Sequence, residues 1–279
     1  MKTYTLNNGV IMPAFGLGTF RVEAGESTYE TVLNALKIGY RHIDTAMMYQ
    51  NEEDVGRAIR ESGIPREEIF VTTKVVKQYN GNEEKIKADI DGSLNRLNIG
   101  YVDLLLMHWP NQKYEINSVV WKIFETYYQA GKFRAIGVSN FQKHHLIELL
   151  KTAKIKPTVN QIECHPLLTQ NAMLEFLKEH NIQMTSYGPF GKGRVFESPT
   201  FDILKEIADK YKATVAQVIV AWGLKRDIVM IPKSVHVERL KENFDGQFVD
   251  LSSEDVERIT KLNRAQRVYS DPDNNNFTE

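Results

Sequence analysis

Short apolar runs alternate with longer amphipathic segments along almost the whole chain. Eight of these runs are rich in Val, Ile, Leu and Thr and are too continuous for strands with one solvent face. Such runs are typical of strands buried on both faces. We therefore predict strands at residues 15–20, 41–46, 69–76, 102–109, 135–141, 158–164, 183–188 and 228–234.

The segments between these runs carry apolar residues at helical spacing. We expect the helix at 27–39 to open with a capping box of Ser27 and Glu30 and to end at Gly39. Further helices are predicted at 83–100, ending at Gly100, and at 141–155, 169–181, 200–212, 214–226 and 252–263.

Eight strand–helix units without a break in composition predict a single (β/α)8 barrel domain spanning residues 1–279. An open, doubly wound sheet has the same periodicity and remains the alternative. Ahead of the barrel, residues 3–13 are predicted to form a β-hairpin around Asn8-Gly9. The loop at 186–199 and the polar tail around 271–276 are the segments that we expect to be mobile.

The composition is that of an ordinary globular protein, with 42% apolar residues, 25% charged residues and a formal charge of -1. A charge near zero argues against nucleic acid or an anionic membrane as the main partner. The start shows no secretory signal, and the single cysteine, Cys164, suits a reducing compartment. We expect a cytoplasmic monomer that binds neither nucleic acid nor membrane.

Four polar side chains lie where the second, third and fourth predicted strands end. Asp44 ends the second strand, Tyr49 follows in its loop, Lys74 ends the third and His108 ends the fourth. Reactive groups of such barrels lie at the carboxyl ends of the strands, and neighbouring strands are about 4.8 Å apart. The four groups can therefore converge at one rim.

Each of the four also has a simpler explanation when it is taken alone. Asp44 could cap the next helix, and Tyr49 could be an amphipathic surface aromatic. Lys74 could extend to solvent, and His108 could be a satisfied core histidine. A carboxylate and an ammonium buried side by side, however, neutralise each other, whereas either alone would be costly.

Such a group of residues can deliver a proton. A free tyrosine has a pKa of about 10 and is a reluctant acid near neutral pH. An adjacent ammonium favours the phenolate, so we expect Lys74, held by Asp44, to lower the pKa of Tyr49. With His108 hydrogen-bonded near the same reacting oxygen, Tyr49 can act as a general acid toward a developing alkoxide.

Six motifs together resemble one known family: GYRHIDTAMMYQNE, VTTKV, LLLMHWP, GVSNF, VNQIECHP and IPKS. Over nearly the whole chain the sequence closely resembles the aldo-keto reductases, which are NADPH-dependent carbonyl reductases built on this barrel. It looks most like the bacterial prostaglandin F synthase-like or 2,5-diketogluconate reductase-like members. The resemblance implies an oxidoreductase acting on CH–OH groups, with Asp44, Tyr49, Lys74 and His108 as its catalytic tetrad. It implies that a nicotinamide hydride and the Tyr49 proton reduce aldehydes and ketones to alcohols.

The resemblance also implies a set of cofactor residues. Ser139, Asn140 and Gln161 match the positions that bind the carboxamide, and Tyr187 matches the aromatic that stacks on the nicotinamide. Lys233 and Arg239 match a clamp for a 2′-phosphate, which favours NADPH, although His236 at a variable position leaves NADH use possible. The remaining expected cofactor residues are Thr19, Gly188, Phe190, Ser234, Val235 and Asn243.

By position, the substrate site is expected to be walled by Phe20, Met48, Tyr49, His108 and Trp109. Phe277 in the tail is a further candidate, although the tail matches the family poorly. Such walls favour small to medium carbonyl compounds with some apolar character. The loop at 110–117, PNQKYEIN, is short for the family, which indicates an open and permissive pocket.

Several other sites are disfavoured. GLGTFR lacks the third glycine of a dinucleotide-binding turn, and GPFGKG lacks the Walker spacing and is more plausible as a flexible loop over the pyrophosphate. The pairs His144-His145 and Cys164-His165 have no metal-site signature, so no metal is expected. Two rival functions remain: a Schiff-base aldolase using Lys74, and a nucleotide-binding regulatory protein.

Overall fold

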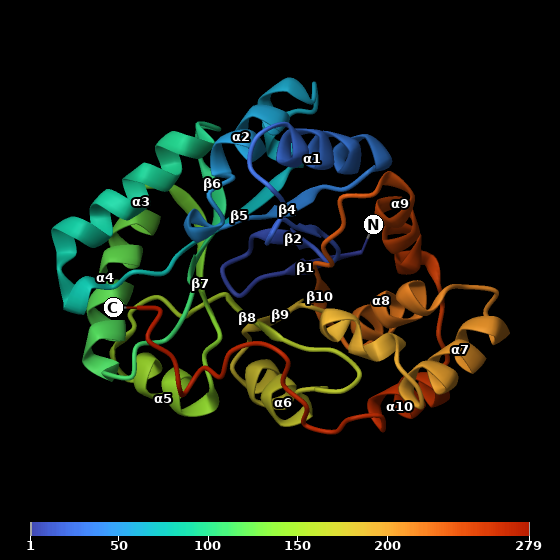
Figure 1. The fold of residues 1–279 in the computed structure, drawn as a ribbon. Helices are drawn as coiled ribbons and strands as arrows, with labels where there is room; N and C mark the ends of the chain where they lie inside the picture. The colour runs from blue at the N-terminus through green and yellow to red at the C-terminus, as the bar shows by residue number, and fades with distance from the viewer. Residues whose placement is uncertain (1, 279) are drawn as a thin grey trace.

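The computed structural model describes residues 2–278 and contains one sheet of eight parallel strands (Figure 1). All eight predicted strands are present, each within a few residues of its expected bounds. Neighbours along the chain are neighbours in the sheet, from β3 to β10. The strands are β3 (Leu17–Gly18), β4 (His42–Asp44), β5 (Phe70–Val75), β6 (Val102–Met107), β7 (Phe133–Ser139), β8 (Val159–Glu163), β9 (Gln183–Tyr187) and β10 (Val229–Met230).

The first and last strands meet and close the sheet into a barrel. Phe15 forms a parallel bridge with Met230, and the backbone N–H of Gly16 donates to the carbonyl of Met230 at 2.9 Å. A Cβ at Gly18 would lie 2.8 Å from the carbonyl oxygen of Ile231, so only glycine permits this close approach. The closed barrel is confirmed, and the open doubly wound sheet is excluded.

The predicted hairpin, β1 (Thr3–Thr5) and β2 (Ile11–Pro13), is also present. Its loop turns at Gly9, whose φ of 87° is in the left-handed region that such a loop requires. Leu6 and Met12 are buried together with Leu104 and Val159 of the barrel interior. The hairpin therefore plugs the amino-terminal end of the barrel and leaves the carboxyl end for a functional site.

Helices surround the barrel, as the ring of ribbons in Figure 1 shows. Helices α2 and α4 were not predicted from the sequence, whereas α7 and α8, which both lie between β9 and β10, match the helices predicted at 200–212 and 214–226. The helices are α1 (Glu26–Ile38), α2 (Glu52–Glu61), α3 (Glu83–Leu97), α4 (Tyr114–Gln129), α5 (Lys143–Thr152), α6 (Asn171–Glu179), α7 (Thr200–Lys210), α8 (Val215–Lys225), α9 (Val237–Asp245) and α10 (Ser253–Thr260). No helix within residues 2–278 has both the length and the apolar character that a membrane span requires.

Two predicted helix ends are wrong and one is confirmed. α1 begins after Gly25 without a side-chain cap, because the N–H of Gly25 donates to Asp54 on α2 at 2.6 Å. α3 ends before Asn98, which adopts a φ of 46° and terminates the helix two residues ahead of Gly100. α1 ends at Gly39 as predicted, with a φ of 124°.

Candidate active site

Asp44, Lys74, Tyr49 and His108 lie together at the carboxyl-end rim of β4, β5 and β6. The Nζ atom of Lys74 donates to Asp44 Oδ1 at 2.5 Å and to the carbonyl oxygen of Thr45 at 2.8 Å. It lies 3.4 Å from the hydroxyl oxygen of Tyr49. The structure therefore brings together the four side chains that the sequence analysis selected.

Tyr49 is positioned by a single 3-10 turn, η1 (Met47–Tyr49), that directly follows β4. Its ring centroid lies 5.1 Å from that of Phe20 and 5.7 Å from that of His108, which is nearly perpendicular to it. These two neighbours hold the phenol over Lys74. The short turn after β4, together with these two ring contacts, therefore fixes the orientation of the Tyr49 hydroxyl group.

The Asp44–Lys74 pair is almost completely removed from solvent, with side chains 3% and 0% exposed. Burial raises the pKa of the Asp44 carboxyl and lowers the pKa of Lys74, and the attraction between the two opposes both shifts. The second oxygen of Asp44 accepts a hydrogen bond from Gln161 Nε2 at 2.7 Å. Because Lys74 is held in an ion pair, it lacks the free lone pair that a Schiff-base nucleophile requires.

The expectation that Lys74 lowers the pKa of Tyr49 is wrong for this structure. Burial raises the pKa of Tyr49 well above its ordinary value, and the nearby Asp44 carboxylate raises it further. The physical reason is that Asp44 neutralises Lys74 at a shorter distance than Lys74 reaches Tyr49. The phenol therefore stays protonated at all physiological pH values and keeps its proton available for donation.

His108 is neutral, because burial and the charge of Lys74 hold its pKa well below the ordinary value. Its backbone N–H donates to Val75 on β5 at 2.9 Å, and its carbonyl accepts from Asn140 Nδ2 at 2.9 Å. The side-chain Nδ1 is buried without a hydrogen-bond partner among residues 2–278. A neutral imidazole at this place can donate one hydrogen bond to a polar substrate atom.

The four residues expected at the nicotinamide form one network at the ends of β7, β8 and β9. Ser139 Oγ donates to the carbonyl of Gln161 at 2.8 Å, and Asn140 Nδ2 contacts Ser139 Oγ at 3.2 Å. Tyr187 donates its hydroxyl proton to Asn140 Oδ1 at 2.6 Å. Gln161 reaches across the barrel to Asp44, which links this network to the acid group.

Three further predicted cofactor residues border this network. Thr19 is buried, and its hydroxyl donates to the carbonyl of Asp44 at 3.0 Å. Gly188 follows β9 with a φ of 59°. Phe190 precedes the 3-10 segment η4 (Gly191–Phe196) and packs against Phe196, with ring centroids 5.9 Å apart. The 186–199 loop, which we expect to be mobile, contains this 3-10 segment.

The five residues expected at the phosphate end follow β10. Lys233 and Arg239 are exposed, and neither forms an ion pair within the described part of the chain. The hydroxyl of Ser234 accepts from the N–H of His236 at 3.2 Å, immediately before α9 begins. Val235 is half-buried, and Asn243 is buried on α9. Two unpaired cations next to a helix N-terminus form a surface suited to an anion.

The predicted substrate walls differ in exposure. Phe20 and Met48 are 40% and 42% exposed, whereas Trp109 is 8% exposed. Phe277 packs on Trp109, with ring centroids 4.9 Å apart, so the structure places this uncertain candidate beside the other walls. The loop after β6 is shorter than expected, because α4 already begins at Tyr114.

The attachment of the tail, residues 264–278, was not predicted from the sequence, and only its polar part around 271–276 was expected to be mobile. The tail has no helix or strand, yet it runs past α6 and α5 to the side of α4 (Figure 1). It is fastened along its length: Gln112 Nε2 donates to the carbonyl of Pro272 at 2.7 Å, and the backbone N–H of Gln78 donates to Thr278 at 3.0 Å. Glu163, a carboxylate inside the buried VNQIECHP motif, also binds the tail. A carboxylate in a buried strand needs a partner, and this was the one feature of the sequence that could have predicted the attachment of the tail.

The two histidine pairs show different surroundings. His144, His145 and Asp273 bring three possible ligand atoms within 4.8 Å of one another. His145 Nδ1, however, accepts a hydrogen bond from the N–H of Gln142, so its Nε2 carries the proton and is a poor ligand. His165 is buried and bound to Glu163 at 3.0 Å, as a structural residue would be.

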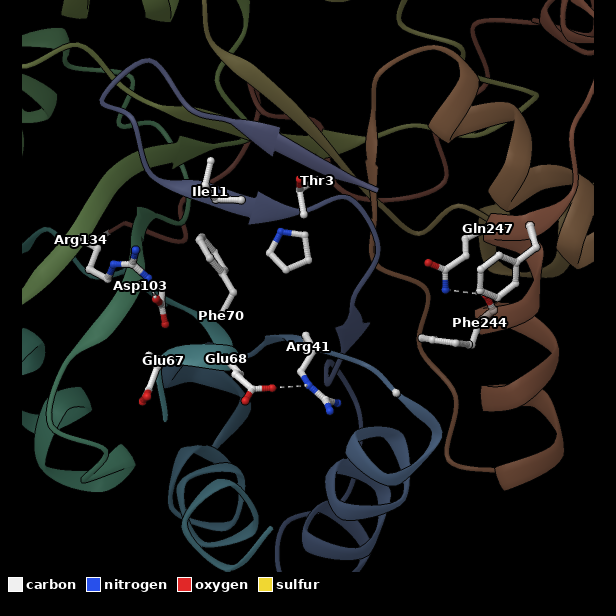
Figure 2. A pocket seen from close by; sticks show the side chains of 13 residues that line it. Thr3, Ile11, Arg41, Glu67, Glu68, Phe70, Asp103, Arg134, Phe244 and Gln247 are labelled. Carbon is white, nitrogen blue, oxygen red and sulfur yellow. Dashed lines mark hydrogen bonds and ion pairs between the residues drawn. The ribbon is translucent and has the colours of Figure 1, made fainter. Parts of the chain in front are cut away.

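Two cavities, of about 530 and 740 Å³, lie away from this rim. Figure 2 shows the first, between the hairpin residues Thr3 and Ile11 and the first residue of β5, Phe70. Arg41 and Glu68 approach each other within 3.8 Å on its wall. Both cavities border the amino ends of strands, so they lie opposite the tetrad and do not belong to the candidate active site.

Comparisons with known proteins agree with this geometry. The model of the aldo/keto reductase family matches residues 14–264. The chain is 47% identical over 272 residues to glyoxal reductase of Bacillus subtilis (strain 168), covering 97% of this chain and 96% of that protein. It is 46% identical over 270 residues to 9,11-endoperoxide prostaglandin H2 reductase of Trypanosoma cruzi (strain CL Brener), covering 97% and 94%. A solved mutant of Gox0644 in complex with NADPH is 34% identical with a TM-score of 0.91, covering 99% and 98%.

Proposed function

The chain belongs to the aldo/keto reductase family, and we propose that it reduces small aldehydes, α-dicarbonyls and ketones to alcohols with NADPH and with Tyr49 as the general acid. The observation that carries this proposal is the cluster at the barrel rim, where the hydroxyl of Tyr49 lies 3.4 Å from a lysine that is itself paired with a buried aspartate. The three groups occupy neighbouring positions and are held by short contacts.

The proton step uses three residues of the chain. NADPH, when bound, supplies the hydride that converts the carbonyl carbon into an alcohol carbon. Tyr49 and His108 hold the carbonyl oxygen by hydrogen bonds, and the Tyr49 proton passes to that oxygen as negative charge develops on it. An alkoxide is a stronger base than a phenolate, so this transfer remains favourable although burial raises the pKa of Tyr49. Lys74 then stabilises the phenolate that remains.

The residues present fit a dinucleotide phosphate. Lys233 and Arg239 are exposed cations without an ion-pair partner in residues 2–278, at the start of α9, where backbone N–H groups and the helix dipole favour an anion. A 2′-phosphate placed there would gain charge-assisted hydrogen bonds that NADH cannot make. At the other end, Ser139, Asn140 and Gln161 offer hydroxyl and amide groups suited to a carboxamide. The NADPH complex of the similar Gox0644 supports this assignment.

The substrate class follows from the walls and from the relatives. Phe20, Met48 and Trp109 provide a small apolar surround, and the short loop before α4 leaves the site open. Glyoxal reductase, at 47% identity, is a protein that by its name reduces a two-carbon dicarbonyl. We therefore propose glyoxal-type compounds as good substrates. A single domain, a monomeric state and a cytoplasmic location stay predictions.

The test is the absorbance of the reduced nicotinamide across a panel of aldehydes, α-dicarbonyls, keto-sugars and quinones, with NADPH and NADH in parallel. We expect consumption of NADPH that depends on the carbonyl compound and is fastest with glyoxal-type compounds. Tight NADPH binding without turnover on any carbonyl would instead support the regulatory alternative. Trapping of substrate on Lys74 by borohydride would support the aldolase alternative.

A further inference from the structure

Glu163, the last residue of β8, is a carboxylate with no exposed surface that the proton-transfer mechanism does not use. Its Oε1 accepts from the backbone N–H of Val268 at 2.7 Å, and its Oε2 lies 3.3 Å from the N–H of Tyr269. Arg267 Nη1 lies 3.3 Å from Oε2, and His165 lies 3.0 Å from Oε1. Four donors, three of them from the tail, therefore surround one buried carboxylate.

The attachment of residues 267–269 to Glu163 fixes the position of Tyr269. Its ring stands perpendicular to the ring of Tyr187, with centroids 5.2 Å apart. Gly188 leaves the space that the ring occupies, since a Cβ at that position would lie 2.5 Å from Tyr269 Cε2. Lys192 of the η4 segment lies over the same ring, with Nζ 4.5 Å from its centroid. Tyr269 is thus enclosed by three neighbours at the exit of β9.

Tyr187 is in turn joined to the candidate active site, because its hydroxyl donates to Asn140 at 2.6 Å. An edge-on ring on one side and a hydrogen bond at the hydroxyl leave Tyr187 a single orientation. A chain of contacts therefore runs from Glu163 through Tyr269 to the aromatic face expected to meet the nicotinamide ring. Each link in that chain is a short contact between buried or half-buried groups.

We propose that Glu163 is a positioning residue for the reduction: it anchors the tail at 267–269 so that Tyr269 fixes the orientation of Tyr187. The tail thereby becomes part of the cofactor side of the site and not only a wall for the substrate. This inference rests on the proposed function, because the orientation of Tyr187 matters only where a nicotinamide ring binds. Glu163 acts through two other residues and contacts no reacting atom.

Glu163→Gln tests the anchor, because it preserves size while removing the charge that four donors share. We expect NADPH to bind about tenfold more weakly, because the tail loses hydrogen bonds to a charged acceptor and Tyr269 no longer holds Tyr187 in one orientation. We also expect faster tryptic cleavage after Arg264 or Arg267 in the folded protein. Glu206→Gln is the matched control, since Glu206 pairs with Arg258 at an exposed place on α7. That variant should bind NADPH as the wild type does.

A double-mutant cycle separates positioning from simple stabilisation. Tyr269→Ala should weaken NADPH binding by a similar factor, and adding Glu163→Gln to it should weaken binding little further. Additive losses, or a lower Tm with unchanged NADPH affinity in Glu163→Gln, would overturn the proposal. If Glu163→Gln does not fold, Tyr269→Ala decides alone: weaker NADPH binding supports the proposal and unchanged binding overturns it.

NADPH binding is measured by fluorescence, independently of turnover. Wild-type protein that binds NADPH but reduces no carbonyl compound would contradict the proposed function, while the binding cycle would still test the anchor. Wild-type protein that turns over, together with additive losses in the cycle, would contradict the anchor alone.

Discussion

The Nζ atom of Lys74 lies 3.4 Å from the hydroxyl oxygen of Tyr49, while the same atom forms its shortest contact with a buried carboxylate. The lysine is therefore close enough to stabilise a phenolate once the proton has left. It is also too well neutralised to draw the proton off beforehand. Tyr49 therefore stays protonated until the reaction, and Lys74 contributes mainly by stabilising the phenolate after the proton has been transferred.

Removing the carboxylate of this pair should destabilise the protein. Asp44→Asn leaves the ammonium of Lys74 buried among neutral acceptors with no counter-charge, which costs roughly 3–5 kcal/mol of unfolding free energy. Turnover should fall as well, because Lys74 loses its fixed position. Urea unfolding followed by circular dichroism measures the first effect. Asp209→Asn is the control, because it breaks only an exposed pair with Lys205, and it should cost no more than about 1 kcal/mol. Equal losses of unfolding free energy in both variants would contradict the claim that Asp44 neutralises a buried lysine.

The phosphate clamp predicts a cofactor-specific loss. Lys233→Met or Arg239→Met should raise the KM for NADPH about 10- to 100-fold, since each removes a charge-assisted hydrogen bond to phosphate. The KM for NADH should change little. Lys241→Met serves as the control, because Lys241 lies on the same helix but pairs with Asp245. Equal losses with both cofactors would place the phosphate elsewhere.

Stability should depend on pH through a buried histidine. Burial lowers the pKa of His42 to about 3, whereas in the unfolded chain it is about 6.5. Between these values the unfolded state binds a proton that the folded state does not. The free energy of unfolding therefore falls as the pH falls, by up to about 1.4 kcal/mol per unit. Urea unfolding between pH 7 and roughly pH 5 should show a smaller slope in His42→Asn than in the wild type, and identical slopes would argue against this assignment.

The pH profile of the reduction should be flat through neutrality. Burial keeps Tyr49 protonated and holds the pKa of His108 far below the ordinary range, so neither group changes charge between roughly pH 6 and 9. The kcat for carbonyl reduction, measured with saturating NADPH, should therefore stay nearly constant there. A fall in kcat with a midpoint near pH 7 would show that one of the two groups titrates.

Much of the fold was predictable because parallel barrel strands have a simple sequence pattern. The run LLLM at 104–107 of β6 is apolar at every position, which requires burial on both faces. Helix α2 was not predicted, since only Val55, Ala58 and Ile59 give it an apolar side among charged residues. The expected cap at Ser27 failed because a tertiary contact, between Gly25 and Asp54, decides where α1 begins.

The tetrad was predictable from position, because polar residues such as Lys74 and His108 interrupt otherwise apolar strand ends. The electrostatic balance was not, since the pKa of Tyr49 depends on burial and on the relative distances of Lys74 and Asp44. The attachment of the tail was also hidden. It depends on contacts between Glu163 and residues more than 100 positions away, which no local pattern encodes.

The central claim is that the proton of Tyr49 is the one delivered to the substrate oxygen, and Tyr49→Phe tests it most directly. The variant removes one oxygen atom and keeps the ring that packs on Phe20 and His108. With glyoxal and saturating NADPH, we expect kcat to fall by roughly 10²- to 10⁴-fold while the Kd for NADPH stays within about twofold. A variant that turns over at the wild-type rate would remove Tyr49 from the reaction and contradict the account.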